Sequence, residues 1–147
     1  MTEYSNVRSY LGGLIRRIVI PAPDGSDYLV RWQFPIGFRR ACYVHKIVQS
    51  DGDRDLHDHP WNFISILVYG RYVEETPGGN KRLKNWFNPH RATDLHRVQL
   101  FKRNGKEIPV YTVVIRGKRL RDWGFQTADG WKTWRDYNAE KFGSEVV

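Results

Sequence analysis

The sequence has little cysteine, no long apolar run and no surplus of acidic residues. Its single cysteine, Cys42, excludes a disulfide framework within one chain and a cysteine-rich zinc module, and we expect it to be a buried, small apolar residue. The longest apolar stretches, such as Ile64–Tyr69, are only as long as a strand, and no basic stretch followed by a long apolar run stands at the N-terminus. We therefore predict neither a signal peptide nor a membrane span, and we expect a cytoplasmic protein.

Positive charge is in excess, with 24 Lys and Arg against 16 Asp and Glu, which gives a formal net charge of +8. An excess of positive charge is one indication of a protein that binds nucleic acid. The basic residues are scattered, however, in short groups: Arg16–Arg17, Arg39–Arg40, Lys81–Arg82, Lys102–Arg103 and Lys118–Arg119 with Arg121. We interpret this as a solvated basic surface that would also attract an anionic small molecule, and we expect no nucleic-acid partner.

The length and composition predict one folded domain over residues 1–147, because 40% of the residues are hydrophobic and 14% are aromatic. Short runs of strand-forming residues alternate with turns: Tyr28–Phe34, Ala41–Gln49, His57–Tyr69 (one long strand or a bent pair), Arg71–Glu75, Lys84–Phe87, Thr93–Leu100, Val110–Arg116, and a hairpin of Trp123–Thr127 with Trp131–Tyr137. Residues 1–20 fit either a short helix or an extended lead-in, and the tail after Tyr137 fits a short helix or a frayed end. About eight or nine strands with little helix predict an all-β sandwich or small barrel.

The segment His57-Asp58-His59 carries the clearest chemical signal. Side chains at i and i+2 of a strand point to the same face, so His57 and His59 are close enough to share one ion. A third imidazole can come from His96, which lies in the predicted strand Thr93–Leu100 on a face that also carries Val98 and Leu100. Neutral imidazoles in an apolar pocket are good ligands for iron, zinc, nickel or copper. We predict a metal site made of His57, His59 and His96.

These residues resemble the first and second motifs of the cupin superfamily. His57-Asp58-His59 followed by Gly70 is similar to the first motif, and His96-Arg97-Val98 is similar to the histidine region of the second. The resemblance covers roughly Ala41–Gly117 and implies a cupin-type double-stranded β-helix, a jelly-roll barrel. Phe63 stands where the first motif has its glutamate, so the usual set of three histidines and one glutamate is reduced to three histidines.

A set of three histidines is similar to the set found in the thiol dioxygenase branch of the cupins. The chain also resembles that branch in having a glycine followed by a glutamate downstream, here Gly70 and Glu74. That branch also has a Ser-x-His-x-Tyr element, and the corresponding region here, Thr112–Arg116, has neither the His nor the Tyr. The run Arg121–Phe125 resembles small cupins of bacteria and phages. Thiol oxidation is therefore one hypothesis among several.

Other residues are assigned by their place relative to the histidines. Asp55 is a candidate fourth ligand that would replace the missing glutamate, and Phe63, Trp61, His45 and Trp123 are candidates to line the pocket. Asp58 is expected on the opposite face in a surface hydrogen bond or salt bridge. His90 follows Pro89 in a turn and is expected to be exposed.

Three functions remain open from the sequence. The first is a metal-dependent, dioxygenase-like enzyme with Fe(II) as the expected ion and Zn, Ni or Mn as alternatives, acting on a small polar or anionic substrate. The second is a non-catalytic cupin that binds a small ligand, and the third is a phage accessory or interaction protein that uses the barrel as a scaffold. The sequence identifies no catalytic residue and leaves the oligomeric state open, with a homodimer as one option.

Overall fold

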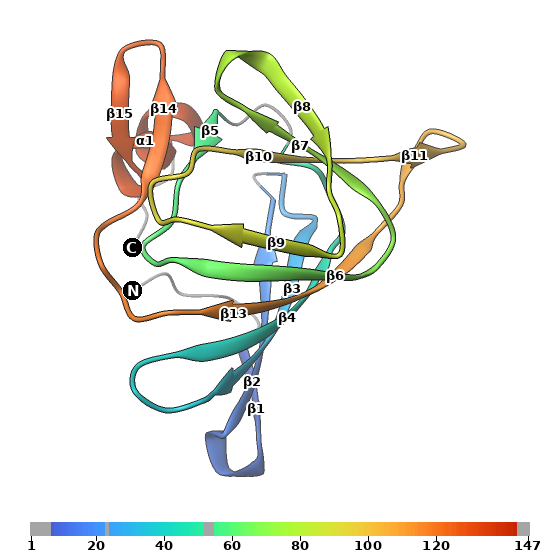
Figure 1. Ribbon diagram of the computed structural model, residues 1–147, viewed down its shortest axis with the longest axis vertical. Coiled ribbons are helices and arrows are strands. Elements are labelled where there is room, and N and C mark those ends of the chain that lie inside the picture. Colours follow the sequence, from blue (N-terminus) through green and yellow to red (C-terminus); the bar gives the residue numbers. More distant parts are fainter. Residues whose placement is uncertain (1–6, 23, 52–54, 144–147) are drawn as a thin grey trace.

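The computed structural model describes residues 7–22, 24–51 and 55–143, and nearly all of its regular structure is antiparallel β-sheet (Figure 1). The strands are β1 (Val7–Tyr10), β2 (Ile15–Pro21), β3 (Asp27–Pro35), β4 (Ala41–Ile47), β5 (Leu56–His57), β6 (Phe63–Tyr69), β7 (Tyr72–Thr76), β8 (Asn80–Leu83), β9 (Phe87–His90), β10 (Arg97–Leu100), β11 (Lys102–Arg103), β12 (Lys106–Glu107), β13 (Val110–Arg116), β14 (Gly124–Thr127) and β15 (Gly130–Thr133). One α-helix, α1 (Trp134–Phe142), and two 3-10 turns, η1 (Leu11–Gly13) and η2 (Pro77–Gly79), complete the set. The predicted all-β fold with little helix is confirmed.

Two layers of strands form the barrel. The larger is a seven-stranded sheet in the order β1-β2-β3-β4-β13-β6-β9. The other layer consists of β10-β7-β8 and β15-β14-β5, and an isolated antiparallel bridge between His57 and His96 joins these two small sheets edge to edge. The jelly-roll arrangement thus brings the segment around residue 57 against the segment around residue 96, which are far apart in the sequence.

Alternation along the strands of the large sheet decides which side chains face the interior. On β4, Tyr43, His45 and Ile47 line the interior cavity, while Cys42 lies on the other face and is only half-buried. On β3, Leu29 and Arg31 face the same cavity. Residues two apart share a face in a strand, so this pattern follows directly from the sequence period.

Gly70 follows the last residue of β6, at a point where the backbone bends. Its φ is +89°, a left-handed conformation that favours glycine, and a Cβ at this position would lie 2.7 Å from Cγ1 of Val110 and 3.2 Å from the carbonyl oxygen of Pro109. The glycine of the predicted motif is therefore required by both conformation and space.

The C-terminal residues close one end of the barrel. The β14–β15 hairpin leads into α1, whose N-terminal Thr133 side chain accepts a hydrogen bond from the backbone N–H of Asp136. Phe125, Trp134 and Tyr137 form a buried cluster with Trp123 packed against it. Among the described residues, no helix has the length and hydropathy needed to span a membrane.

Several predicted elements differ from the observed ones. His57–Tyr69, expected as one long strand or a bent pair, breaks after His57 and resumes at Phe63, so the second alternative is the observed one. The predicted strand Lys84–Phe87 is wrong, since β8 ends at Leu83 and β9 begins at Phe87. The N-terminal segment forms the β1–β2 hairpin, which projects at the bottom of Figure 1.

Candidate metal centre

Backbone hydrogen bonds fix the positions of the three predicted histidines. His57 and His96 lie directly opposite each other and exchange two backbone hydrogen bonds, each 2.9 Å long. The N–H of His59 donates to the carbonyl oxygen of Ala92 at 3.0 Å. The three imidazoles are thus presented by rigid backbone, and the structure brings all three together.

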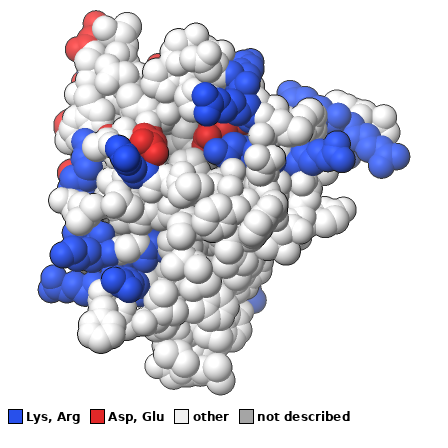
Figure 2. Space-filling view, viewed as in Figure 1, with Lys and Arg blue, Asp and Glu red and all other residues white. Residues whose placement is uncertain are grey.

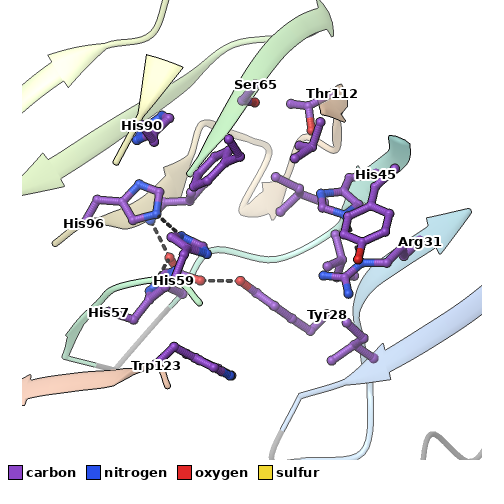
Figure 3. Close-up of a pocket in the computed structure, with 18 of the residues that line it drawn as sticks. Tyr28, Arg31, His45, His57, His59, Ser65, His90, His96, Thr112 and Trp123 are labelled. Atoms are coloured by element: carbon purple, nitrogen blue, oxygen red, sulfur yellow. Dashed lines mark hydrogen bonds and ion pairs between the residues drawn. The ribbon is translucent and has the colours of Figure 1, made fainter. Parts of the chain in front are cut away.

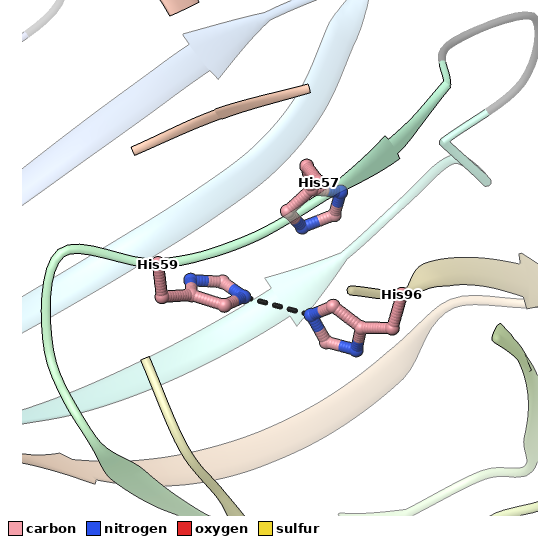
Figure 4. A group of neighbouring side chains, drawn as sticks. All are labelled: His57, His59 and His96. Atoms are coloured by element: carbon pink, nitrogen blue, oxygen red, sulfur yellow. Dashed lines mark hydrogen bonds between the residues drawn. The ribbon is translucent and has the colours of Figure 1, made fainter. Parts of the chain in front are cut away.

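The imidazoles converge within a small volume (Figure 4). Each offers one nitrogen, and the three nitrogens lie within 4.8 Å of one another. The Nε2 atoms of His59 and His96 are 2.7 Å apart and share a hydrogen bond. Two nitrogens bound side by side to an ion at about 2.0–2.1 Å are separated by about 3 Å, so only a small shift is needed to place an ion between them.

Two buried carboxylates contact the other nitrogens of this group. Oε1 of Glu74 lies 2.5 Å from Nδ1 of His96, and Oδ2 of Asp51 lies 3.8 Å from Nδ1 of His57. Carboxylates behind imidazoles commonly fix the tautomer and ring orientation of metal-binding histidines. The contact leaves Nε2 of His96 directed toward the other two rings.

Burial favours a neutral imidazole at His59. Burial, followed by the neighbouring histidines, lowers the pKa of His59 well below its usual value near 6.5. Burial alone would raise the pKa of Glu74, but its hydrogen bonds with His96 and Lys84 outweigh this effect and lower the pKa to about 2. A neutral imidazole keeps its lone pair available, so the donor set fits a divalent transition-metal ion.

The histidine group lies in the wall of a cavity of about 590 Å³ inside the barrel (Figure 3). That volume is in the range of sites that bind small molecules. The four residues expected to line a pocket, Phe63, Trp61, His45 and Trp123, all contribute to this wall. The Phe63 ring lies 4.6 Å from the His59 ring, centroid to centroid, so an apolar group occupies the position of the motif's glutamate.

Asp55 is not brought into the histidine group. Its carboxylate lies 3.9 Å from Nζ of Lys141 on helix α1, and its backbone N–H donates to the hydroxyl of Tyr137. Neither of the two groups of possible metal ligands among the described residues includes Asp55. The structure therefore gives no support to Asp55 as a fourth ligand.

His90 is buried, which corrects the expectation that it is exposed. It ends strand β9, only 9% of its surface is accessible, and its ring stacks on Phe63 at 4.5 Å. With Glu74 and His96 it forms a second group whose ligand atoms lie within 4.8 Å of one another. His96 belongs to both groups, so the structure offers two alternative places for one ion.

Asp58 points away from the histidines, as expected, but it is buried and not at the surface. Its carboxylate accepts hydrogen bonds from Arg121, from Nε1 of Trp131 at 2.9 Å and from the backbone N–H of Gly124 at 2.8 Å. A Cβ on Gly124 would lie 1.9 Å from the carbonyl oxygen of Lys132, so only glycine fits there. This network ties the histidine segment to the C-terminal hairpin.

Sequence reasoning did not assign Asp51 or Arg31 to the site. Asp51 is only 5% exposed and also accepts a hydrogen bond from the Tyr28 hydroxyl. Arg31 could have been suspected, because it shares a strand face with Leu29 in an alternating segment. The pairing of Asp51 with His57 could not have been found, because it depends on the tertiary arrangement.

Together, the jelly-roll layers and the histidine group in the interior define a cupin fold, and solved structures of cupin-fold proteins agree with this. HppE in an iron(II) form matches 78% of this chain and 65% of its own, with 12% identity and a TM-score of 0.54. Hydroxypropylphosphonic acid epoxidase from S. wedmorenis matches over 78% and 64%, with 12% identity and a TM-score of 0.50. AerE from Microcystis aeruginosa matches over 82% and 52%, with 12% identity and a TM-score of 0.52.

These similarities concern the fold, because the identities are low. The chain spans less than two thirds of the length of these three proteins. No protein-family model matches the sequence, and no curated protein matches it significantly.

Proposed function

We propose that this protein is a metal-dependent cupin enzyme that holds one Fe(II) ion with His57, His59 and His96 and acts on a small anionic substrate in an oxygen-dependent reaction. The observation that carries the proposal is the convergence of the three imidazoles in the wall of the interior cavity. Three protein ligands leave positions on an ion for other molecules, which a catalytic site needs and a closed structural site lacks.

The choice of iron is supported by the fold neighbours. HppE was crystallised with iron(II), and it shares the cupin fold with this chain. An iron(II) ion bound here would supply electron-transfer chemistry with dioxygen. Zn, Ni and Mn are the alternatives that metal analysis has to distinguish.

The surrounding residues have separate tasks in this proposal. Glu74 holds the ring of His96 in orientation through a hydrogen bond, and Asp51 places a negative charge 3.8 Å from Nδ1 of His57. Phe63 and Trp61 form an apolar wall beside the histidines, which limits access of water. The sequence resemblance to thiol dioxygenases makes small thiols one substrate class to test, and the absent Ser-x-His-x-Tyr element argues against assuming cysteine itself.

Metal analysis of variants tests the site. Natively purified protein should contain close to one divalent ion per chain, and His57→Ala should lose most of it. The matched control is His90→Gln, which removes a buried histidine of the second ligand group and should keep the ion. The reverse result, with metal retained in His57→Ala and lost in His90→Gln, would place the ion with Glu74 and His90 and would refute the proposed site.

Oxygen uptake tests the reaction. Protein loaded anaerobically with Fe(II) should consume oxygen faster than free Fe(II) when small thiols or carboxylates are added. Binding of one of these molecules without any uptake would instead identify a non-catalytic ligand-binding cupin, the second function left open by the sequence.

A further inference from the structure

Arg31 is a charged side chain directed into the interior of the barrel. It lies on β3 between β2 and β4, shares its face with Leu29, and contributes to the wall of the cavity that holds the histidine group. Interior positions of a small barrel are normally filled by apolar side chains. Arg31 is half-buried, so its guanidinium is partly withdrawn from water on a face where an apolar side chain would be expected.

Neighbouring residues hold the Arg31 guanidinium in place. His45 lies directly opposite Arg31 on β4, and its Nε2 accepts a hydrogen bond of 3.0 Å from Nε of Arg31. The guanidinium carbon lies 4.5 Å from the centre of the Tyr43 ring, and that ring also stacks on His45. Neither contact neutralises the charge, since His45 is an uncharged acceptor and Tyr43 offers only its ring face.

The outer edge of the guanidinium is left for a ligand. Among the described residues, no carboxylate forms an ion pair with Arg31, and its two Nη groups make no hydrogen bond. Nη1 and Nη2 together present parallel donors whose spacing matches the two oxygens of a carboxylate. A positive charge held rigidly in a cavity with its donors unused is what an oxyanion site requires.

Arg31 and His45 lie across the cavity from His57 and His96 (Figure 3). A small molecule between the two sides can therefore contact both at once.

We infer that Arg31, positioned by His45 and Tyr43, binds the carboxylate or a similar oxyanion of a small ligand whose other end faces the histidine group. The inference rests on the proposed function and adds the substrate class and the residue that selects it. It makes Arg31 a specificity-determining residue and His45 a positioning residue.

Two thiol probes of similar size test this selection. Mercaptoacetate has a carboxylate where 2-mercaptoethanol has a hydroxyl, and both can offer sulfur to an ion. With Co(II) loaded as the metal probe, thiolate binding is followed by the visible absorption spectrum. The wild-type protein should bind mercaptoacetate about ten- to a hundredfold more tightly than 2-mercaptoethanol, as expected for a charge-assisted pair.

Variants distinguish a preference caused by Arg31 from one caused by the probe's own carboxylate binding to the metal ion. Arg31→Gln should abolish the preference while leaving cobalt stoichiometry and 2-mercaptoethanol affinity unchanged, and Arg31→Lys should retain part of it. Arg16→Gln, which removes an exposed charge on β2, should behave like wild type. Equal affinity of the wild type for both probes, or a preference that survives in Arg31→Gln, would overturn the inference.

An experiment without metal distinguishes a failure of the proposed metal site from a failure of the proposed oxyanion site. Calorimetry of the metal-free protein should show weaker binding of mercaptoacetate that still depends on Arg31. If the wild type binds no cobalt but this dependence is present, the proposed metal function fails and the oxyanion site stands. If cobalt binds at His57, His59 and His96 and Arg31 has no effect in either arm, the oxyanion site fails and the metal site stands.

Discussion

At the scale of single residues, buried carboxylates decide which nitrogens the histidines present to one another. Glu74 is only 4% exposed and contacts His96, His90 and Lys84 at the same time. Its low pKa keeps it ionised throughout the physiological range. An ionised carboxylate behind an imidazole makes that ring a stronger donor on its opposite nitrogen, which favours metal binding at Nε2 of His96.

The buried histidines should make the stability of the metal-free protein depend on pH. Burial, followed by the charge of His96, lowers the pKa of His90 to about 4, against a usual value near 6.5 in the unfolded chain. Between these values the unfolded state binds more protons, so stability decreases as the pH falls from about 6.5 toward 4. His90 alone should lower the free energy of unfolding by about 2 kcal/mol between pH 8 and pH 5.

Urea denaturation of the metal-free protein at pH 8 and pH 5 measures this loss. His90→Gln should reduce the pH dependence, although His59 contributes in the same direction and some dependence should remain. Identical pH dependence in the wild type and His90→Gln would show that His90 is not held neutral by the fold.

At the scale of elements, the C-terminal hairpin and helix support the strand that carries His57. β14 pairs with β5, with Phe125 opposite His57, and Tyr137 stacks on Phe125 at 3.9 Å. Trp134 stacks on Trp123, whose ring lies 6.5 Å from that of His57. The histidine segment is short, since β5 has two residues, so this packing supplies rigidity that the strand itself lacks.

Removing the Trp134 side chain should therefore affect both stability and the metal centre. Trp134→Ala should lower the free energy of unfolding by about 3–5 kcal/mol, because Trp134 is only 8% exposed. It should also weaken metal binding, because β5 loses support. Trp86→Ala is the matched control, since Trp86 is 71% exposed, and it should cost less than about 1 kcal/mol. Equal unfolding midpoints for the two variants in denaturant titrations would contradict this account.

The sequence predicted elements well where the signal is local. Val110–Arg116 is strongly β-forming and is observed with the same bounds as β13. The turn at Ala128-Asp129-Gly130 connects β14 and β15 as expected. The predicted strand Trp131–Tyr137 is wrong beyond Thr133, because α1 begins at Trp134. Lys84–Phe87 failed because β9 is defined by its pairing with β6, which a single segment does not reveal.

The histidines of the candidate site could also be predicted from local patterns in the sequence. Two histidines at i and i+2 face the same way by backbone geometry, and motif resemblance suggested His96 as the third. The carboxylates behind them could not be predicted, because Asp51 and Glu74 reach the rings only through the barrel's closure. The burial of Asp58 was missed because its partners, Arg121 and Trp131, lie in the C-terminal segment.

At the scale of the whole molecule, the basic residues on the face seen in Figure 2 do not form one continuous track. Figure 2 shows Lys and Arg in separate groups on the face in view, one of them on the projecting β11–β12 hairpin, which carries Lys102, Arg103 and Lys106. Some basic side chains also form ion pairs within the protein: Arg97 pairs with Glu75, and Arg121 pairs with Asp58. A strong nucleic-acid surface needs many phosphate contacts along a continuous path.

We therefore predict only weak, salt-sensitive binding to nucleic acid. Each phosphate contact releases counterions, so the affinity of separate basic groups should fall steeply between low and physiological salt. In fluorescence-anisotropy titrations with duplex DNA and single-stranded RNA, the dissociation constant at about 0.15 M salt should lie above about 1 μM, a value typical of non-specific binding. Lys102→Glu with Arg103→Glu should weaken the binding seen at low salt by a modest factor, because the hairpin is one of several groups. A sub-micromolar constant that persists at physiological salt would instead favour the scaffold function, in which the barrel serves to present a nucleic-acid surface.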